Sequence, residues 1–162
     1  TITLLAPSKT FNIAGLEASV AIIEDDDLRA KFEGARQGLV GWVNLLGQVA
    51  TQASYQHGEP WLEELLTYLQ TNRDYVFDFV NQELPGISML KPEGTYLAWL
   101  DCRQANIAGK PNEFFLEQAR VAMNDGGWFG QGGEGFVRFN FGCPRALIEE
   151  ALDKMKTALE KL

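Results

Sequence analysis

One lysine near the start of the chain lies in a sequence suited to covalent chemistry. Lys9 follows the apolar run 1–5, whose β-branched and aliphatic residues predict a strand that Pro7 ends. A lysine held at a strand end among apolar residues loses hydration, and its pKa falls. The neutral amine can then attack an aldehyde and form an imine. We therefore expect Lys9 to be a nucleophile toward a carbonyl group, with a lysine on a solvated loop as the ordinary alternative.

A second candidate residue is Arg138, in the strand-like run 136–141. Strand alternation places Arg138 on one side with Phe136 and Asn140. An arginine on a rigid strand presents a planar fork that can bind both oxygens of a carboxylate, which lysine cannot imitate. From the residues alone, a solvated arginine on the polar face of a sheet is the commoner interpretation.

The segment around Lys9 resembles a known lysine segment. Residues 8–16 match the pattern Ser-Lys-x-Phe-Asn-x-x-x-Leu of fold type I pyridoxal-phosphate enzymes of the aminotransferase class I/II family, in the cystathionine β-lyase-like branch. The resemblance continues to the last helix and covers essentially the whole chain. It implies that Lys9 carries the cofactor pyridoxal 5'-phosphate and later removes the α-proton of an amino-acid substrate. Ser8 adjoins Lys9 and is a candidate to bind the cofactor phosphate, with a serine that caps a turn as the equal alternative.

The same resemblance assigns two substrate-binding candidates. Residues 136–145 are similar to the family segment whose first arginine binds the substrate α-carboxylate, which implies this role for Arg138. Residues 94–96 resemble the strand start that approaches the substrate in relatives, which makes Tyr96 a weaker candidate. Many related enzymes place a phosphate-binding serine and an arginine where this chain has Ala6 and Glu17, so phosphate anchoring must depend on other segments.

The resemblance also implies an α/β architecture. We expect residues 1–40 to be the end of a large cofactor-binding domain, with a piece of its sheet, and residues 41–162 to be a C-terminal small α/β domain. The chain then reads as the C-terminal part of a homodimeric enzyme that is an aminotransferase or a carbon–sulfur β-lyase, and this part alone should be inactive. The alternative is a non-catalytic α/β module for interaction or dimerisation.

Hydrophobic periodicity predicts the elements that position these residues. Besides the run at 1–5, residues 18–23 predict a buried strand beside it, 95–101 a well-buried strand and 136–141 the last strand. Helices are expected from Leu28 through Leu39, at about 44–56, from Pro60 to about 84 with a core-facing stripe, from Pro111 through Val121, and after Pro144. The acidic run 24–27 precedes a helical pattern and is expected to cap that helix, in place of binding a metal.

The glycine-rich stretch 126–135 contains a formal G-x-G-x-x-G match. A dinucleotide fingerprint needs a strand before the glycines and a helix opening after them, whereas these glycines run into the strand at Phe136. We expect a mobile connection that can lie over the substrate.

Composition excludes several classes of function. The formal charge of −8 and the pI near 4.7 oppose binding to nucleic acid, which depends on clustered Lys and Arg. We find no apolar run long enough for a membrane span, and a cytoplasmic origin is the default expectation. Cys102 and Cys143 have neither zinc-site nor disulfide-framework spacing, and we expect ordinary buried thiols and no metal site.

Overall fold

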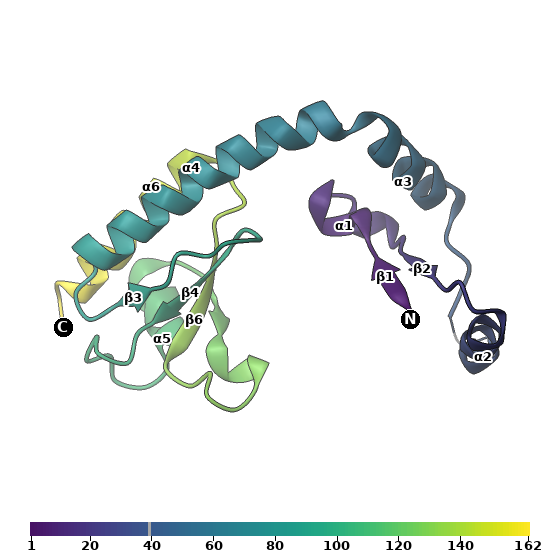
Figure 1. The fold of residues 1–162 in the computed structure, drawn as a ribbon. Helices are drawn as coiled ribbons and strands as arrows, with labels where there is room; N and C mark the ends of the chain where they lie inside the picture. The colour runs from purple at the N-terminus through teal and green to yellow at the C-terminus, as the bar shows by residue number, and fades with distance from the viewer. Residues whose placement is uncertain (39) are drawn as a thin grey trace. The chain divides into compact units, whose positions relative to one another are not determined.

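Helix α4 (Glu59–Glu83) contributes to both of the compact units into which the chain divides. The computed structural model describes residues 1–38 and 40–162, and the two units are Thr1–Leu65 and Leu66–Leu162. Each unit contains its own sheet, labelled in Figure 1. The expected domain boundary near residue 40 concerns the longer enzyme, and it stays a prediction.

The first unit begins with a two-stranded antiparallel sheet. Strands β1 (Thr3–Leu5) and β2 (Val20–Ile22) pair with Thr3 opposite Ile22, which confirms both strands and their adjacency. Residues 18–23 were expected to form a buried strand, but all three residues of β2 are exposed, and only the flanking Ala18 and Ile23 of that run are buried. The apolar content of β1 and β2 favours extended backbone, but the described residues of this unit leave the two strands uncovered.

Two capped helices follow in this unit. Asp25 caps helix α2 (Asp26–Arg36) by accepting a hydrogen bond from the backbone N–H of Leu28, so the acidic run has the predicted capping role. Leu39, expected as the last apolar position of this helix, lies outside the described residues. Helix α3 (Leu45–His57) begins after the N-cap Asn44 and ends at Gly58, close to its predicted bounds.

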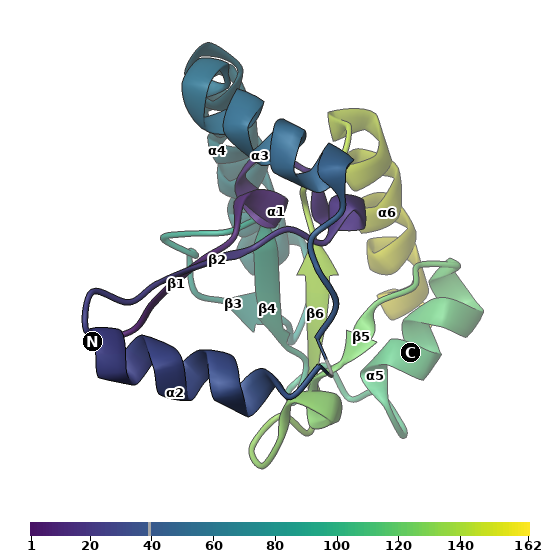
Figure 2. The same cartoon turned by 90° about the vertical axis from the view of Figure 1, so that its right-hand side faces the viewer.

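The second unit contains an antiparallel four-stranded sheet in the order β3-β4-β6-β5, seen in Figure 2. Strands β4 (Leu97–Asp101) and β6 (Phe136–Asn140) were expected, and they pair along their full length. Strands β3 (Ser88–Met89) and β5 (Asn124–Asp125) have two residues each and were not expected. Strand β4 is not buried throughout, because only alternate residues face the core.

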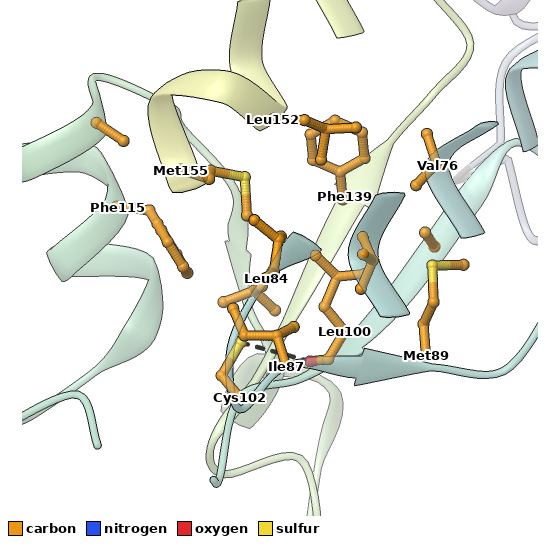
Figure 3. Close-up of a cluster of buried hydrophobic side chains, with 14 of the residues drawn as sticks. Val76, Leu84, Ile87, Met89, Leu100, Cys102, Phe115, Phe139, Leu152 and Met155 are labelled. Carbon is orange, nitrogen blue, oxygen red and sulfur yellow. Dashed lines mark hydrogen bonds between the residues drawn. The ribbon is translucent and has the colours of Figure 1, made fainter. Parts of the chain in front are cut away.

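Helices cover one face of this sheet. The C-terminal half of α4, the helical turns α5 (Pro111–Phe114) and η2 (Phe115–Ala119), and helix α6 (Arg145–Leu159) all contribute to one core with the inward residues of β4 and β6. Figure 3 shows part of this core, in which side chains such as Leu100, Phe115 and Met155 come together from the sheet and the helices. Fully buried members include Val76, Val80, Leu100, Phe115, Val137, Ile148, Leu152 and Met155.

The stripe predicted along α4 is core only in its second half. Val76 and Val80 are fully buried, whereas Leu66 is 55% exposed. Between these halves lies Asn72, which is buried and donates two hydrogen bonds, to the carbonyls of Phe141 (3.2 Å) and Cys143 (3.0 Å). Because buried carbonyls are costly to leave unpaired, Asn72 fixes the end of β6 to this helix.

The two cysteines are free thiols. Burial raises the pKa of the Cys102 thiol to about 12, which keeps it protonated and unreactive near neutral pH. Cys143 is partly exposed, and burial also raises its pKa. Among the residues that the structure describes, no helix has the length and apolar character needed to cross a membrane.

Candidate functional site

Lys9 lies in the connection between β1 and β2, on the one-turn helix α1 (Pro7–Thr10). Its side chain is exposed, and among the described residues it makes no hydrogen bond or ion pair. The expected placement just after a strand is confirmed. The expected apolar surroundings are not found, because no described residue of this unit covers the lysine.

The backbone around Lys9 is nevertheless fastened at defined points. Phe11 closes α1 by donating its N–H to the carbonyl of Pro7, 2.9 Å away. Its ring stands edge-on to Tyr55, with centroids 5.8 Å apart, and stacks on Trp61. A side chain at Gly58 would collide with the Phe11 ring, since a Cβ there would lie 2.6 Å from it. The aromatic residue two positions after Lys9 therefore anchors the lysine turn to α3 and to the start of α4.

A second attachment holds the far end of this connection. The 3-10 turn η1 (Ala14–Leu16) ends with a carbonyl that accepts a hydrogen bond from the Asn44 side chain, 3.1 Å away. Gly47 lies against the same carbonyl, and a Cβ on it would be 2.7 Å from the Leu16 oxygen. The path that carries Lys9 from β1 to β2 is thus held by α3 at both ends.

Ser8 neighbours Lys9 inside the helical turn and is partly buried. Its hydroxyl makes no hydrogen bond with the described residues, and the turn has no side-chain cap. The capping alternative for Ser8 is therefore not realised. Ala6 and Glu17, which stand where many relatives have phosphate-binding residues, are both exposed.

Arg138 lies at the centre of strand β6, on the sheet face opposite the helices. The register places it between Trp99 of β4 and Asn124 of β5. Its Nη2 donates to Oδ1 of Asn124 at 3.0 Å, and its guanidinium carbon lies 4.5 Å from the centre of the Phe129 ring. The Nε atom is buried and has no hydrogen-bond partner among the described residues.

The partners of Arg138 are neutral, which separates it from several other arginines. Arg29, Arg73 and Arg103 each form an ion pair with an aspartate close in sequence. Within residues 1–38 and 40–162, no carboxylate pairs with Arg138. A partly buried cation without a counterion attracts an anion, because its hydration is reduced and its charge is not balanced. The geometry therefore favours binding of a carboxylate or another anion at Arg138.

Three aromatic rings, those of Trp99, Phe129 and Phe136, pack together next to this arginine. The Trp99 ring stacks on Phe136, with centroids 5.6 Å apart, and meets the Phe129 ring edge-on at 5.5 Å. Trp99 is 37% exposed and Phe129 is 51% exposed. Large exposed aromatic surface next to an unpaired cation is typical of a binding surface.

The loop 126–135 is built around two glycines and one aspartate. Asp125 caps the 3-10 turn η3 (Gly126–Phe129) by accepting from Gly127 N–H, and its other oxygen lies 3.0 Å from Nζ of Lys110. Two hydrogen bonds hold the pKa of the Asp125 carboxyl below its usual value: the one from Lys110 has the larger effect, and the one from Gly127 the smaller. The contribution of this carboxylate to folding stability is therefore fully present above the ordinary aspartate pKa. It is lost as the pH falls through the lowered pKa of Asp125 in the folded protein.

The glycine pair closes the loop on itself. A Cβ on Gly133 would lie 2.1 Å from the Gly126 carbonyl oxygen, so neither position has room for a side chain. Strand β6 begins at Phe136, and no helix opens after the glycines, which confirms that this is not a dinucleotide-binding turn. The expected mobility of the loop stays a prediction.

Tyr96 precedes β4 and is partly buried against the core cluster. Its carbonyl accepts from Phe141 N–H at 2.9 Å, and its ring lies beside Gly142. Among the described residues, no hydrogen bond joins Tyr96 to Arg138. The structure thus places Tyr96 at the end of β6, whereas Asn124, Trp99 and Phe129 contact or flank Arg138 directly.

Comparison with known proteins shows the family of this chain. The family model described as aminotransferase class I and II matches residues 1–155. The chain belongs to the aminotransferase class I and II family. It is 42% identical over 161 residues to cystathionine β-lyase PatB of Bacillus subtilis, and 38% identical over 159 residues to protein MalY of Escherichia coli.

The chain spans about two fifths of the length of these relatives. The PatB match covers 98% of this chain and 41% of PatB, and the MalY match covers 96% and 41%. The solved structure of cystalysin from Treponema denticola, described as containing pyridoxal 5'-phosphate, superposes with a TM-score of 0.93 at 37% identity, over 99% of this chain and 41% of cystalysin. The fold is therefore that of the C-terminal part of fold type I enzymes, as expected.

Individual residues of this aminotransferase-family chain, taken unit by unit, suit the chemistry of pyridoxal phosphate. The exposed amine of Lys9 has no described partner and is chemically suited to attach an aldehyde. The unpaired Arg138 is suited to a substrate carboxylate. The side chains of Ala6 and Glu17 offer no hydrogen-bond donor for a phosphate.

Three residues around Arg138 were missed by sequence reasoning. Trp99 and Asn124 are found by the strand register, which pairs both with Arg138. A two-residue strand such as β5 gives no periodicity from which that register could be read. Phe129 is brought over the guanidinium by a turn between glycines, and the glycine spacing alone does not specify its direction.

Replacement of Gly133 tests the closed loop. Gly133→Ala places a methyl group against the Gly126 carbonyl and should cost about 1–3 kcal/mol of local stability. We expect faster backbone hydrogen exchange across residues 126–135 in the full-length protein, read by mass spectrometry. Gly127→Ala is the matched control, since its Cβ would make only ordinary contact, 3.5 Å from Asp125. Equal exchange in the two variants would show that the glycine contact does not hold the loop.

Proposed function

We propose that the full-length protein is a pyridoxal-phosphate-dependent enzyme that acts on amino acids, as a carbon–sulfur β-lyase or an aminotransferase. The observation that carries the proposal is a partly buried arginine without a counterion in a family chain that also carries an available lysine. The name of one similar protein, cystathionine β-lyase PatB, favours the lyase. The cofactor supplies an aldehyde for covalent attachment and an electron sink for the pair left at the substrate α-carbon.

Each unit of this chain contributes one main residue to the proposed reaction. Lys9 Nζ is the attachment point, and the amine released when substrate enters would take the α-proton from the substrate. Arg138 would bind the α-carboxylate through its planar fork and fix the orientation of the α-carbon. Ser8 is proposed as a cofactor neighbour, and Tyr96 as a residue near the substrate.

The two activities share their first proton transfer and differ afterwards. If the bond from Cβ to sulfur breaks, cystathionine and water yield homocysteine, pyruvate and ammonia. If the amino group of the substrate is instead transferred to an oxo acid, the reaction is a transamination. Pyruvate released from L-cystathionine without any added oxo acid supports the lyase, whereas turnover that requires an oxo acid supports the aminotransferase.

We further propose that the enzyme is a cytoplasmic homodimer, and that the described part alone gives negligible turnover. The family resemblance supports dimerisation, and the match to only 41% of PatB supports the need for further residues. Those residues would supply the contacts to the cofactor ring and phosphate, since Ala6 and Glu17 do not.

The role of Lys9 can be tested by chemical trapping. Borohydride reduction of the full-length protein with its cofactor, followed by peptide mapping, should find a pyridoxyl group on Lys9. Lys9→Ala should remove the yellow colour and lower turnover by at least about a thousandfold, because covalent attachment and proton transfer are both lost. Lys31→Ala, at an exposed lysine of α2, should change neither property. An unmodified Lys9 would favour a non-catalytic interaction module.

The role of Arg138 can be tested by a substitution that keeps the charge. Arg138→Lys removes the planar fork, and we expect the KM for L-cystathionine to rise about 10–100-fold, the loss of one to two charge-assisted hydrogen bonds. Arg103→Lys is the control, since that arginine is already paired with Asp101 at 2.7 Å. An unchanged KM in Arg138→Lys would contradict carboxylate binding at this position.

A further inference from the structure

The neighbours of Arg138 differ in charge according to the sheet face they occupy. Asn124 and Asp125 are consecutive on β5, and the register pairs them with Arg138 and Val137 respectively. Because side chains alternate along a strand, the neutral amide lies on the face of Arg138 and the carboxylate on the opposite face. On that opposite face, Asp125 forms an ion pair with Lys110 and accepts a hydrogen bond from the backbone N–H of Gly127.

An aspartate in place of Asn124 would change the charge beside Arg138. A carboxylate at position 124 would pair with the guanidinium and cancel its charge, as Asp101 does for Arg103. The amide oxygen of Asn124 accepts one hydrogen bond from Nη2 and adds no charge. The guanidinium is thereby fixed in orientation while its full charge stays available to a ligand.

The other contacts of Arg138 restrict it in the same way. Phe129 lies against one face of the guanidinium, and Trp99 stands beside it on β4. An aromatic ring stabilises a cation without neutralising it. A planar fork held by neutral groups loses less conformational entropy when it binds a carboxylate.

We propose that Asn124 is a positioning residue: its neutral amide oxygen orients Arg138 and leaves the arginine charge uncompensated, and this sets the affinity for the substrate α-carboxylate. The inference rests on the proposed function, in which Arg138 binds that carboxylate. It adds a residue that acts through Arg138 and does not touch the reacting atoms.

The test uses two substitutions in the full-length protein loaded with cofactor. Propionate is the probe for carboxylate binding, and propylamine is the probe that lacks a carboxylate; the change in cofactor absorbance reports both. Asn124→Asp should weaken propionate binding about tenfold or more, since an internal carboxylate then competes for the guanidinium. Asn124→Leu, which is similar in size, should weaken it about threefold to tenfold through lost orientation. Neither should change propylamine binding by more than about twofold.

Asn106→Asp is the matched control for the added charge. Asn106 is exposed, and its backbone φ of 55° is one that asparagine and aspartate both tolerate. Propionate binding should be unchanged in this variant.

Each remaining outcome has a definite meaning. Propionate binding that is unchanged in both Asn124 variants but weakened in Arg138→Lys would overturn the role of Asn124 and leave the proposed function standing. Equal weakening of propionate and propylamine would show a structural effect and would also overturn it. Propionate binding unchanged in Arg138→Lys would remove the carboxylate role of Arg138, and the role of Asn124 with it.

Discussion

The unbalanced charge of Arg138 is the interaction on which the site depends. Three other arginines of this chain, Arg29, Arg73 and Arg103, each pair with an aspartate. Arg138 is instead surrounded by an amide, an aromatic ring and strand neighbours. No internal carboxylate among the described residues therefore competes with a ligand for the Arg138 guanidinium.

The rest of the second unit holds this arginine in place. Val137 and Phe139, on either side of Arg138, are buried in the core under α4 and α6, so the strand cannot slip without exposing them. Asn72 fixes the end of β6, and the closed glycine loop holds Phe129 over the guanidinium. In the first unit, Phe11 plays the corresponding part by anchoring the turn that carries Lys9.

Much of the fold could be predicted from the sequence, since its long elements have clear periodicity and capping residues. Helix α3 between Asn44 and Gly58 and helix α6 after Pro144 are examples. The burial of β2 was predicted wrongly, because apolar composition indicates a strand but does not say whether another segment covers it. Strands β3 and β5 were too short to leave a pattern.

The candidate site was predictable only in part. Lys9 and Arg138 could be proposed from local motifs and a family resemblance. Asn124 and Trp99 are defined by pairing between strands that are distant in sequence, and the sequence does not give that register directly. The difference between Asn124 and Asp125, one neutral and one charged, acquires its meaning only when the sheet face of each is known.

The most direct test of the central claim is a crystal structure of the full-length, cofactor-loaded protein with bound propionate. We expect carboxylate oxygens within hydrogen-bond distance of the Arg138 guanidinium, with Asn124 still accepting from Nη2. An aspartate or glutamate from elsewhere in the protein paired with Arg138, with propionate bound at another place, would contradict it.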